Sequence, residues 1–145
     1  MKITGYTQLI GIIADPIRHS LSPMMHNACF EYLNLDYVYL AFETETLKEA
    51  IEGLKAIKAR GWNVSMPYKK RIIPYLDEIS LVSQLSDSVN TVINDQGYLK
   101  GTSTDGLGWE YGLKEKNISI QDKTLVLLGA GGAATAIMAQ GAIDG

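Results

Sequence analysis

Polar side chains that can hydrogen-bond a sugar or a hydroxy acid follow several apolar segments of this 145-residue chain. Hydroxyl and amide groups bind ring hydroxyls and carboxylates, and a lysine amine beside a carboxylate can transfer a proton. Ligands of α/β proteins bind near strand ends, where these residues are expected to lie. The sequence therefore predicts a site for a small polyhydroxylated molecule. The candidate residues are Ser20, Ser22, Ser65, Lys69, Asn90 and Asp105.

Each candidate also has an ordinary structural explanation. Ser22 precedes Pro23 and is expected to be the N-cap of a helix, and Asp105 is expected to cap a later helix in the same way. Lys69 is of a residue type that is most often solvated. The amide of Asn90 lies in an otherwise apolar strand and must find hydrogen-bond partners there. The shared position of the candidates at strand ends favours a binding site.

A glycine-rich turn provides a second signal. Gly129, Gly131 and Ala134 fit the dinucleotide-binding pattern G-x-G-x-x-A, directly after an apolar run and before an alanine-rich segment. Such a turn lets a pyrophosphate approach the backbone at a helix N-terminus. The alternative is a tight turn without a ligand. The candidate cofactor-binding residues are Gly129, Ala130, Gly131, Gly132 and Ala133.

The histidines and the single cysteine do not indicate a metal site. His19 and His26 have no third partner at the spacing of a metal ligand set. We expect His19 near the binding site, and His26 on the surface or in packing. Cys29 cannot form an internal disulfide, and we expect it to pack in the core.

Alternating apolar and amphipathic segments predict an α/β fold with a mainly parallel sheet. Strands are predicted over residues 9–13, 37–42, 62–66 and 124–128, with a hairpin over residues 88–94 and 98–102. Helices are predicted from Pro23 to about residue 33 and over residues 47–60, 69–75, 80–85, 105–116 and 132–142. Gly61 is expected to end the second helix. The predicted buried stripe of the first helix comprises Met24, Met25, Ala28, Cys29, Tyr32 and Leu33.

The chain divides near Asp105 into two predicted units. Residues 1–105 form an α/β unit, and residues 106–145 form a linking helix followed by the first strand, turn and helix of a Rossmann nucleotide-binding unit. A single strand, turn and helix cannot cover both of its faces. We therefore expect the chain to be an N-terminal fragment of a longer protein, and to be inactive alone.

Composition limits the partners of the chain. Thirteen basic and sixteen acidic side chains give a net charge of −3 and a pI near 5.3, which argues against nucleic acid or an anionic membrane as a partner. No apolar run approaches the roughly 18 residues that span a bilayer. A cytoplasmic protein is the default expectation, and a homodimer stays an open alternative.

Five motifs, taken in order, resemble the shikimate dehydrogenase family, most closely its quinate/shikimate dehydrogenase branch. The resemblance covers essentially the whole chain. The motifs are Ile17-Arg18-His19-Ser20-Leu21-Ser22-Pro23, Asn63-Val64-Ser65-Met66-Pro67-Tyr68-Lys69, Val89-Asn90-Thr91, Gly101-Thr102-Ser103-Thr104-Asp105-Gly106 and Gly129-Ala130-Gly131-Gly132-Ala133-Ala134.

The resemblance implies a role for each candidate residue. Residues 1–105 would be a shikimate-binding substrate domain, followed by the start of an NAD(P)-binding domain. Ser20 and Ser22 would bind the substrate carboxylate, and Lys69 would be the catalytic lysine beside Asp105. Ring hydroxyls would be held by Ser65, Asn90 and Asp105. The implied reaction is reversible reduction of 3-dehydroshikimate to shikimate with NADP or NAD, in aromatic amino acid biosynthesis.

Two departures and two alternatives accompany this resemblance. Ser65 stands where many members have threonine, which keeps the hydroxyl, and Ser103 stands where many have asparagine, which removes an amide. One alternative function is a quinate/shikimate dehydrogenase with dual substrate and cofactor use. The other is an isolated substrate-binding fragment without activity.

Overall fold

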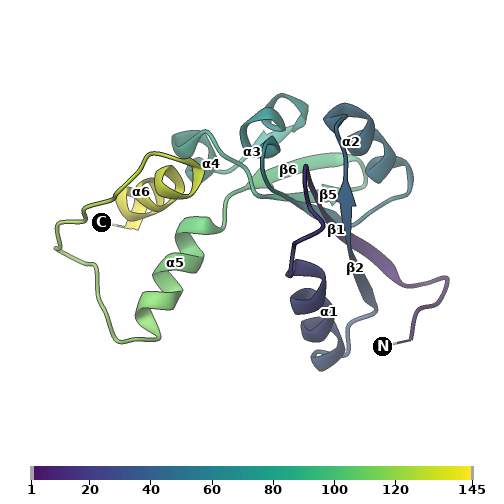
Figure 1. Ribbon diagram of the computed structural model, residues 1–145, viewed down its shortest axis with the longest axis horizontal. Coiled ribbons are helices and arrows are strands. Elements are labelled where there is room, and N and C mark those ends of the chain that lie inside the picture. The colour runs from purple at the N-terminus through teal and green to yellow at the C-terminus, as the bar shows by residue number, and fades with distance from the viewer. Residues whose placement is uncertain (1, 145) are drawn as a thin grey trace.

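The computed structural model describes residues 2–144 and contains one six-stranded sheet with helices on both faces (Figure 1). The sheet has the order β2-β1-β3-β5-β6-β4, which confirms the predicted α/β class. The strands are β1 Gln8–Ala14, β2 Tyr37–Glu43, β3 Gly61–Val64, β4 Glu78–Ile79, β5 Thr91–Asp95 and β6 Tyr98–Thr102. The helices are α1 Ser22–Tyr32, α2 Leu47–Ala56, α3 Tyr68–Arg71, the 3₁₀ turn η1 Ile73–Tyr75, α4 Leu81–Ser86, α5 Asp105–Lys114 and α6 Gly132–Asp144.

The strand directions bring distant parts of the chain to one edge of the sheet. β1 runs parallel to both β2 and β3, whereas β5 runs antiparallel to β3 and pairs Thr91 with Asn63. The start of β5 therefore lies beside the carboxyl end of β3. β6 returns antiparallel to β5 and pairs Thr102 with Thr91, so that α5 begins at the same edge.

Two apolar clusters hold the faces of this sheet. The larger one packs α2 through Ile51 and Leu54 against the buried side chains of Ile13, Trp62 and Val64. The other face, which α1 covers, has a smaller cluster made of Ile12, Ala14, Ile17 and Tyr39 (Figure 1). Neighbouring residues of β1 alternate between the two clusters, as the two-residue repeat of a strand requires.

Helix α6 packs against α4 and α5 at one end of the molecule (Figure 1). Close approach to α5 depends on Gly106, because a Cβ built there would lie 2.5 Å from Cβ of Gln140 and 2.6 Å from the carbonyl oxygen of Ala136. The glycine-rich turn before α6 is thereby held close to the sheet edge that carries the start of α5.

The predicted inner face of α1 is wrong. Met24, Met25 and Tyr32 are exposed by 73%, 57% and 86%, and Cys29 is exposed rather than in the core. The helix faces the sheet with the opposite stripe, which consists of Ser22, Pro23, His26, Asn27 and Phe30. Both stripes are largely uncharged, so periodicity alone could not select the buried one.

The predicted strand over residues 124–128 is also wrong. Those residues have no strand partner within 2–144, and Leu128 is 98% exposed. A strand requires hydrogen bonds to a neighbouring strand, and none of the six described strands pairs with this segment.

Other element boundaries differ by a few residues. α2 ends at Ala56, and the chain turns at Lys58, which has φ 57°. Gly61 is therefore the first residue of β3 and does not end the helix. The short strand β4 was not expected. No helix within the described residues has the length and apolarity needed to cross a membrane.

Candidate functional site

An ion pair between Lys69 and Asp105 forms the centre of the candidate site. Lys69 extends from α3, which follows the carboxyl end of β3, and Asp105 is the first residue of α5. Nζ of Lys69 donates to Oδ2 of Asp105 at 2.7 Å, with about a quarter of each side chain exposed. The pair is therefore partly shielded from water yet open to a ligand, and its ammonium can both donate a hydrogen bond and exchange a proton.

Asn90 fixes the other oxygen of this carboxylate. Its amide nitrogen donates to Oδ1 of Asp105 at 2.6 Å and to Oγ1 of Thr104 at 3.1 Å. Its amide oxygen accepts from the backbone N–H of Thr104 at 3.1 Å and from the hydroxyl of Thr91 at 2.8 Å. The requirement that this buried amide find partners is thus met by the beginning of α5.

A second layer of polar groups continues from Asn90 across the sheet edge. Asn63 in β3 donates to Oγ1 of Thr91 at 3.0 Å and to the backbone oxygen of Asn90 at 3.2 Å. The hydroxyl of Tyr39 in β2 donates to Oδ1 of Asn63 at 2.7 Å. Burial raises the pKa of Tyr39 to about 12, although a hydrogen bond from Ser22 opposes this rise. Tyr39 therefore stays protonated and keeps its donor role at neutral pH.

The three predicted serines lie at the same edge but differ in their contacts. Oγ of Ser20 accepts from the backbone N–H of Ser22 at 3.2 Å. The hydroxyl of Ser22 lies close to the phenol of Tyr39. The N-cap predicted for α1 is wrong, because Ser22 is the first helical residue and Leu21 holds the cap position without a side-chain hydrogen bond. Ser65 follows β3, and its backbone N–H donates to the carbonyl of Ile13.

The loop that carries Ser20 is tied to β2 through Glu43. One carboxylate oxygen of Glu43 accepts from the backbone N–H of Ile17 at 3.1 Å, and the other accepts from Nε of Arg18 at 3.0 Å. The Ile17 N–H and, to a smaller extent, the Arg18 guanidinium hold the pKa of Glu43 below its usual value. Glu43 therefore holds the loop as a carboxylate.

Sequence reasoning did not identify Tyr39, Thr104 or Asn27 as parts of this site. Tyr39 lies inside an apolar strand, and only its 0% exposure beside two asparagines reveals its role. Asn27 on α1 clamps the backbone of Tyr39, with its Oδ1 accepting at 2.8 Å and its Nδ2 donating at 2.9 Å. The N-cap predicted at Asp105 is wrong, because Thr104 occupies the cap position and Asp105 is the first residue of α5. Contacts across strands of this kind leave no local pattern in a sequence.

The glycine-rich turn and Lys69 line the same pocket, which has a volume of about 400 Å³. Gly129 has φ +116°, which favours glycine, and a Cβ built on Gly131 would meet no atom within 4 Å. Lys69 lines one part of this pocket, while Ala130, Gly132 and Thr135 line another. The open backbone at the start of α6 fits the pyrophosphate of a dinucleotide.

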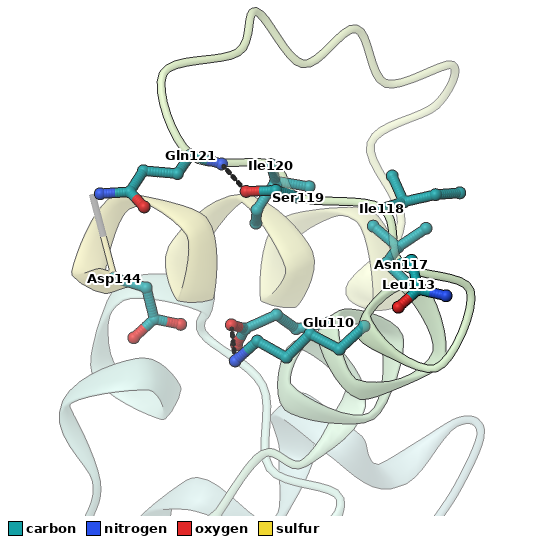
Figure 2. A pocket seen from close by; sticks show the side chains of 9 residues that line it. Glu110, Leu113, Asn117, Ile118, Ser119, Ile120, Gln121 and Asp144 are labelled. Atoms are coloured by element: carbon teal, nitrogen blue, oxygen red, sulfur yellow. Dashed lines mark hydrogen bonds and ion pairs between the residues drawn. The ribbon is translucent and has the colours of Figure 1, made fainter.

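A separate pocket of about 500 Å³ lies between α5, α6 and the loop after α5 (Figure 2). Glu110 and Lys114 form an ion pair of 2.6 Å within it, and Gln121 and Asp144 lie on its other side. It contains none of the predicted site residues. Among residues 2–144, no three His, Cys, Asp or Glu side chains gather as a metal-binding group.

Comparison with known proteins identifies the family. The sequence profile described as the shikimate dehydrogenase substrate-binding domain matches residues 12–92, more than half of the chain. The chain belongs to the shikimate dehydrogenase family. Within the shikimate dehydrogenase family, it is similar to a curated relative from Alkaliphilus metalliredigens named shikimate dehydrogenase (NADP(+)), with 52% identity over 146 residues and 99% of this chain covered.

Solved structures of two relatives share this fold. Shikimate 5-dehydrogenase from Listeria monocytogenes, crystallised with shikimate and NAD, is 55% identical with a TM-score of 0.96 over 100% of this chain. Ligand-free 5-ketofructose reductase of Gluconobacter sp. strain CHM43 is 33% identical with a TM-score of 0.93 over 98%. The chain spans about half the length of these relatives, namely 51% of the Alkaliphilus protein, 51% of the Listeria chain and 52% of the Gluconobacter chain.

Proposed function

We propose that this chain is the substrate-binding half of a shikimate dehydrogenase, which reversibly reduces 3-dehydroshikimate to shikimate with NADPH or NADH. The observation that carries the proposal is the Lys69–Asp105 pair beside the pocket that the glycine-rich turn also lines. Family membership and the name of the Alkaliphilus relative support the same reaction. The fold alone would not choose it, because the 5-ketofructose reductase shares that fold.

Lys69 is the proton-transfer group in this proposal. During reduction, its Nζ donates a proton to the carbonyl oxygen that becomes the ring hydroxyl, and during oxidation it takes that proton back. Asp105 holds the ammonium in place through Oδ2, and Asn90 holds Asp105 through Oδ1. The nicotinamide cofactor, when bound, supplies or accepts the hydride.

The remaining site residues would recognise the substrate. Ser20 and Ser22 would donate hydrogen bonds to its carboxylate, which charge makes a strong acceptor. Ser65, Asn90 and Asp105 would bind the ring hydroxyls. Tyr39 supports this assignment because its phenol lies between Ser22 and Asn63 and joins the two halves of the site.

The cofactor would bind at the glycine-rich turn. Gly129, Ala130, Gly131, Gly132 and Ala133 would hold the pyrophosphate of NADP or NAD through backbone N–H groups. The uncrowded Gly131 and the positive φ of Gly129 support this role.

The organisation of the molecule is part of the proposal. Residues 1–105 would be the substrate domain, and residues 106–145 the linking helix and the first part of the Rossmann domain. The acidic composition and the family resemblance support a small-molecule substrate and a cytoplasmic location. The exposed apolar stripe of α1, with Met24, Met25 and Tyr32, supports a homodimer.

Turnover assays test the proposed function directly. We would join this chain to the second half of the Listeria monocytogenes relative and measure NADPH formation with shikimate and with quinate. We expect shikimate oxidation with NADP, which heat-denatured protein does not give. A faster rate with quinate would favour the quinate/shikimate dehydrogenase branch, and no reaction with either acid would contradict the proposal.

A further inference from the structure

Ser88 carries a buried hydroxyl that has no hydrogen-bond partner within residues 2–144. The residue lies between α4 and β5 and is only 3% exposed. A hydroxyl buried without a partner destabilises the fold, so such groups call for an explanation such as a bound ligand. Ser88 does not contribute to the hydrogen-bond network around Asp105 described above.

The place of Ser88 in the fold indicates what that ligand is. Ser88 lines the pocket between Lys69 and the glycine-rich turn. Its Oγ lies against the first residue of α6, because a Cβ built on Gly132 would be 3.5 Å away from it. With glycine at that position, no side chain separates the hydroxyl from the start of the helix.

The start of α6 adds a second set of donors to the same pocket. Helix α6 has 13 residues, and the N–H groups of its first turn lack acceptors within the helix. These groups and the helix dipole favour an anion at this point. Lys70 is on the pocket wall too, but its charge is paired with Asp87. The unpaired donors in the pocket therefore come from Ser88 and from α6.

We propose that Ser88 donates a hydrogen bond to the phosphate on the nicotinamide side of the bound dinucleotide. This inference rests on the proposed function. The reacting ring must lie against the substrate near Lys69, and the pyrophosphate must lie at the glycine-rich turn. The phosphate joined to the nicotinamide ribose is then the anionic group that reaches the α6 N-terminus between them. Oγ of Ser88 lies against Gly132, at the point where this phosphate would bind.

The site therefore takes one cofactor contact from the substrate domain. If only the nucleotide domain bound the cofactor, substitutions before β5 would not change the affinity for it. With Ser88 as a donor, the phosphate bridges the two proposed domains, and the nicotinamide half depends on both of them.

Two nicotinamide fragments test this inference in the chain of residues 1–145. Nicotinamide mononucleotide carries the phosphate in question, and nicotinamide riboside lacks it. NMR titration would give the Kd of each for the wild type, Ser88→Ala and Ser83→Ala. Ser83 is the matched control, because its hydroxyl is also buried without a partner in the described structure, yet Ser83 does not line this pocket.

We expect Ser88→Ala to weaken mononucleotide binding by about tenfold or more, the size of a hydrogen bond to a charged group. Riboside binding should stay unchanged, and Ser83→Ala should change neither. The Tm of ligand-free Ser88→Ala should not fall, because the variant removes an unsatisfied hydroxyl.

Other results would overturn the inference in distinguishable ways. Equal effects of Ser88→Ala and Ser83→Ala, or equal losses for both fragments, would remove Ser88 from phosphate binding while leaving the proposed dehydrogenase intact. A wild-type chain that binds shikimate but not the mononucleotide would overturn the role of Ser88 at this pocket. Failure to bind shikimate, mononucleotide and NADPH alike would contradict the proposed function as well.

Discussion

Lys69 and Lys70 are adjacent in sequence but have different surroundings. Lys69 is three-quarters buried against Asp105, whereas Lys70 is 75% exposed and paired with Asp87 at the surface. An exposed pair contributes little to stability or to the field at the site. The two residues therefore separate a positioned ammonium from general positive charge.

Replacing these lysines one at a time tests the proton-transfer role. In a polypeptide of the relatives' full length, Lys69→Ala should lower kcat by about 10²–10⁴-fold, the usual effect of a positioned acid–base group. KM should change much less, because the other substrate contacts remain. Lys70→Ala should change kcat little. Similar modest losses in both variants, measured by steady-state kinetics, would show that Lys69 only adds to a positive field.

Ser20 and Ser22 allow a test of carboxylate binding. The double variant Ser20→Ala with Ser22→Ala should raise KM for shikimate, since each lost hydrogen bond to a charged group costs about 1.5–3 kcal/mol. Ser119→Ala is a suitable control, because its hydroxyl accepts from Gln121 in an exposed loop away from the site. An unchanged KM in the double variant would contradict the carboxylate role.

At the scale of elements, the carboxylate of Glu43 connects β2 to the loop before α1. Its pKa is lowered in the fold, so its contribution is present above the ordinary value of 4.5 and is lost as pH falls through the lowered value. The Ser20 loop should then be held most firmly at neutral pH.

Glu43→Gln should weaken shikimate binding at pH 7, because the amide has no charge and only one acceptor oxygen for the two donors, Ile17 N–H and Arg18 Nε. The difference in Kd between variant and wild type should shrink as the pH falls through the lowered pKa of Glu43, because the protonated carboxyl is then uncharged like the amide of the variant. Calorimetry at several pH values measures this. A difference that does not depend on pH would mean that side-chain shape, rather than charge, holds the loop.

How far the sequence predicts each element depends on where its determinants lie. β1 and β2 are confirmed because a continuous apolar run and a β-branched, aromatic run predict strands, and α2 is confirmed because its apolar side chains recur at helical spacing. Both sides of α1 are largely uncharged, and the more apolar side is the exposed one, so the pattern could not show that Met24 faces water and Phe30 the sheet. A short sequence segment also does not show whether a partner strand is present. For this reason, the strand predicted over residues 124–128 is wrong.

The candidate site shows the same division. The juxtaposition of Lys69, Asn90 and Asp105 is present as predicted, since all three follow or precede strands at one sheet edge. Their placement required only the order of the elements. Tyr39 was missed because its contacts to Asn63 and Asn27 come from other strands and helices, 24 and 12 residues away in sequence.

At the scale of the whole molecule, the strands of the described sheet and the glycine-rich turn lie in different parts of the chain. The residues proposed to bind shikimate lie within 1–105, which contain all six described strands, whereas residues 124–128 have no strand partner among those described. Binding and hydride transfer should therefore depend on different lengths of chain.

The chain of residues 1–145 should bind shikimate but catalyse no hydride transfer. Equilibrium titration would measure the binding, and the absorbance of NADPH would measure the reaction, beside a polypeptide of the relatives' full length. Robust turnover by residues 1–145 would contradict this expectation. Lys69→Ala in the short chain provides the control, because it should weaken any activity that arises at this site.

The hairpin of β5 and β6 has a consequence for how this chain can vary in length. The hairpin leaves the site at Asn90, turns at Gln96 and Gly97 and returns to Asp105, with Thr91 opposite Thr102. Adding one residue to each strand next to the turn would lengthen the hairpin and leave the pairing of Thr91 with Thr102 intact. Adding one residue to a single strand would shift the register and turn its side chains to the other face. Insertions near Gln96 should therefore be tolerated when each residue added to β5 is matched by one added to β6.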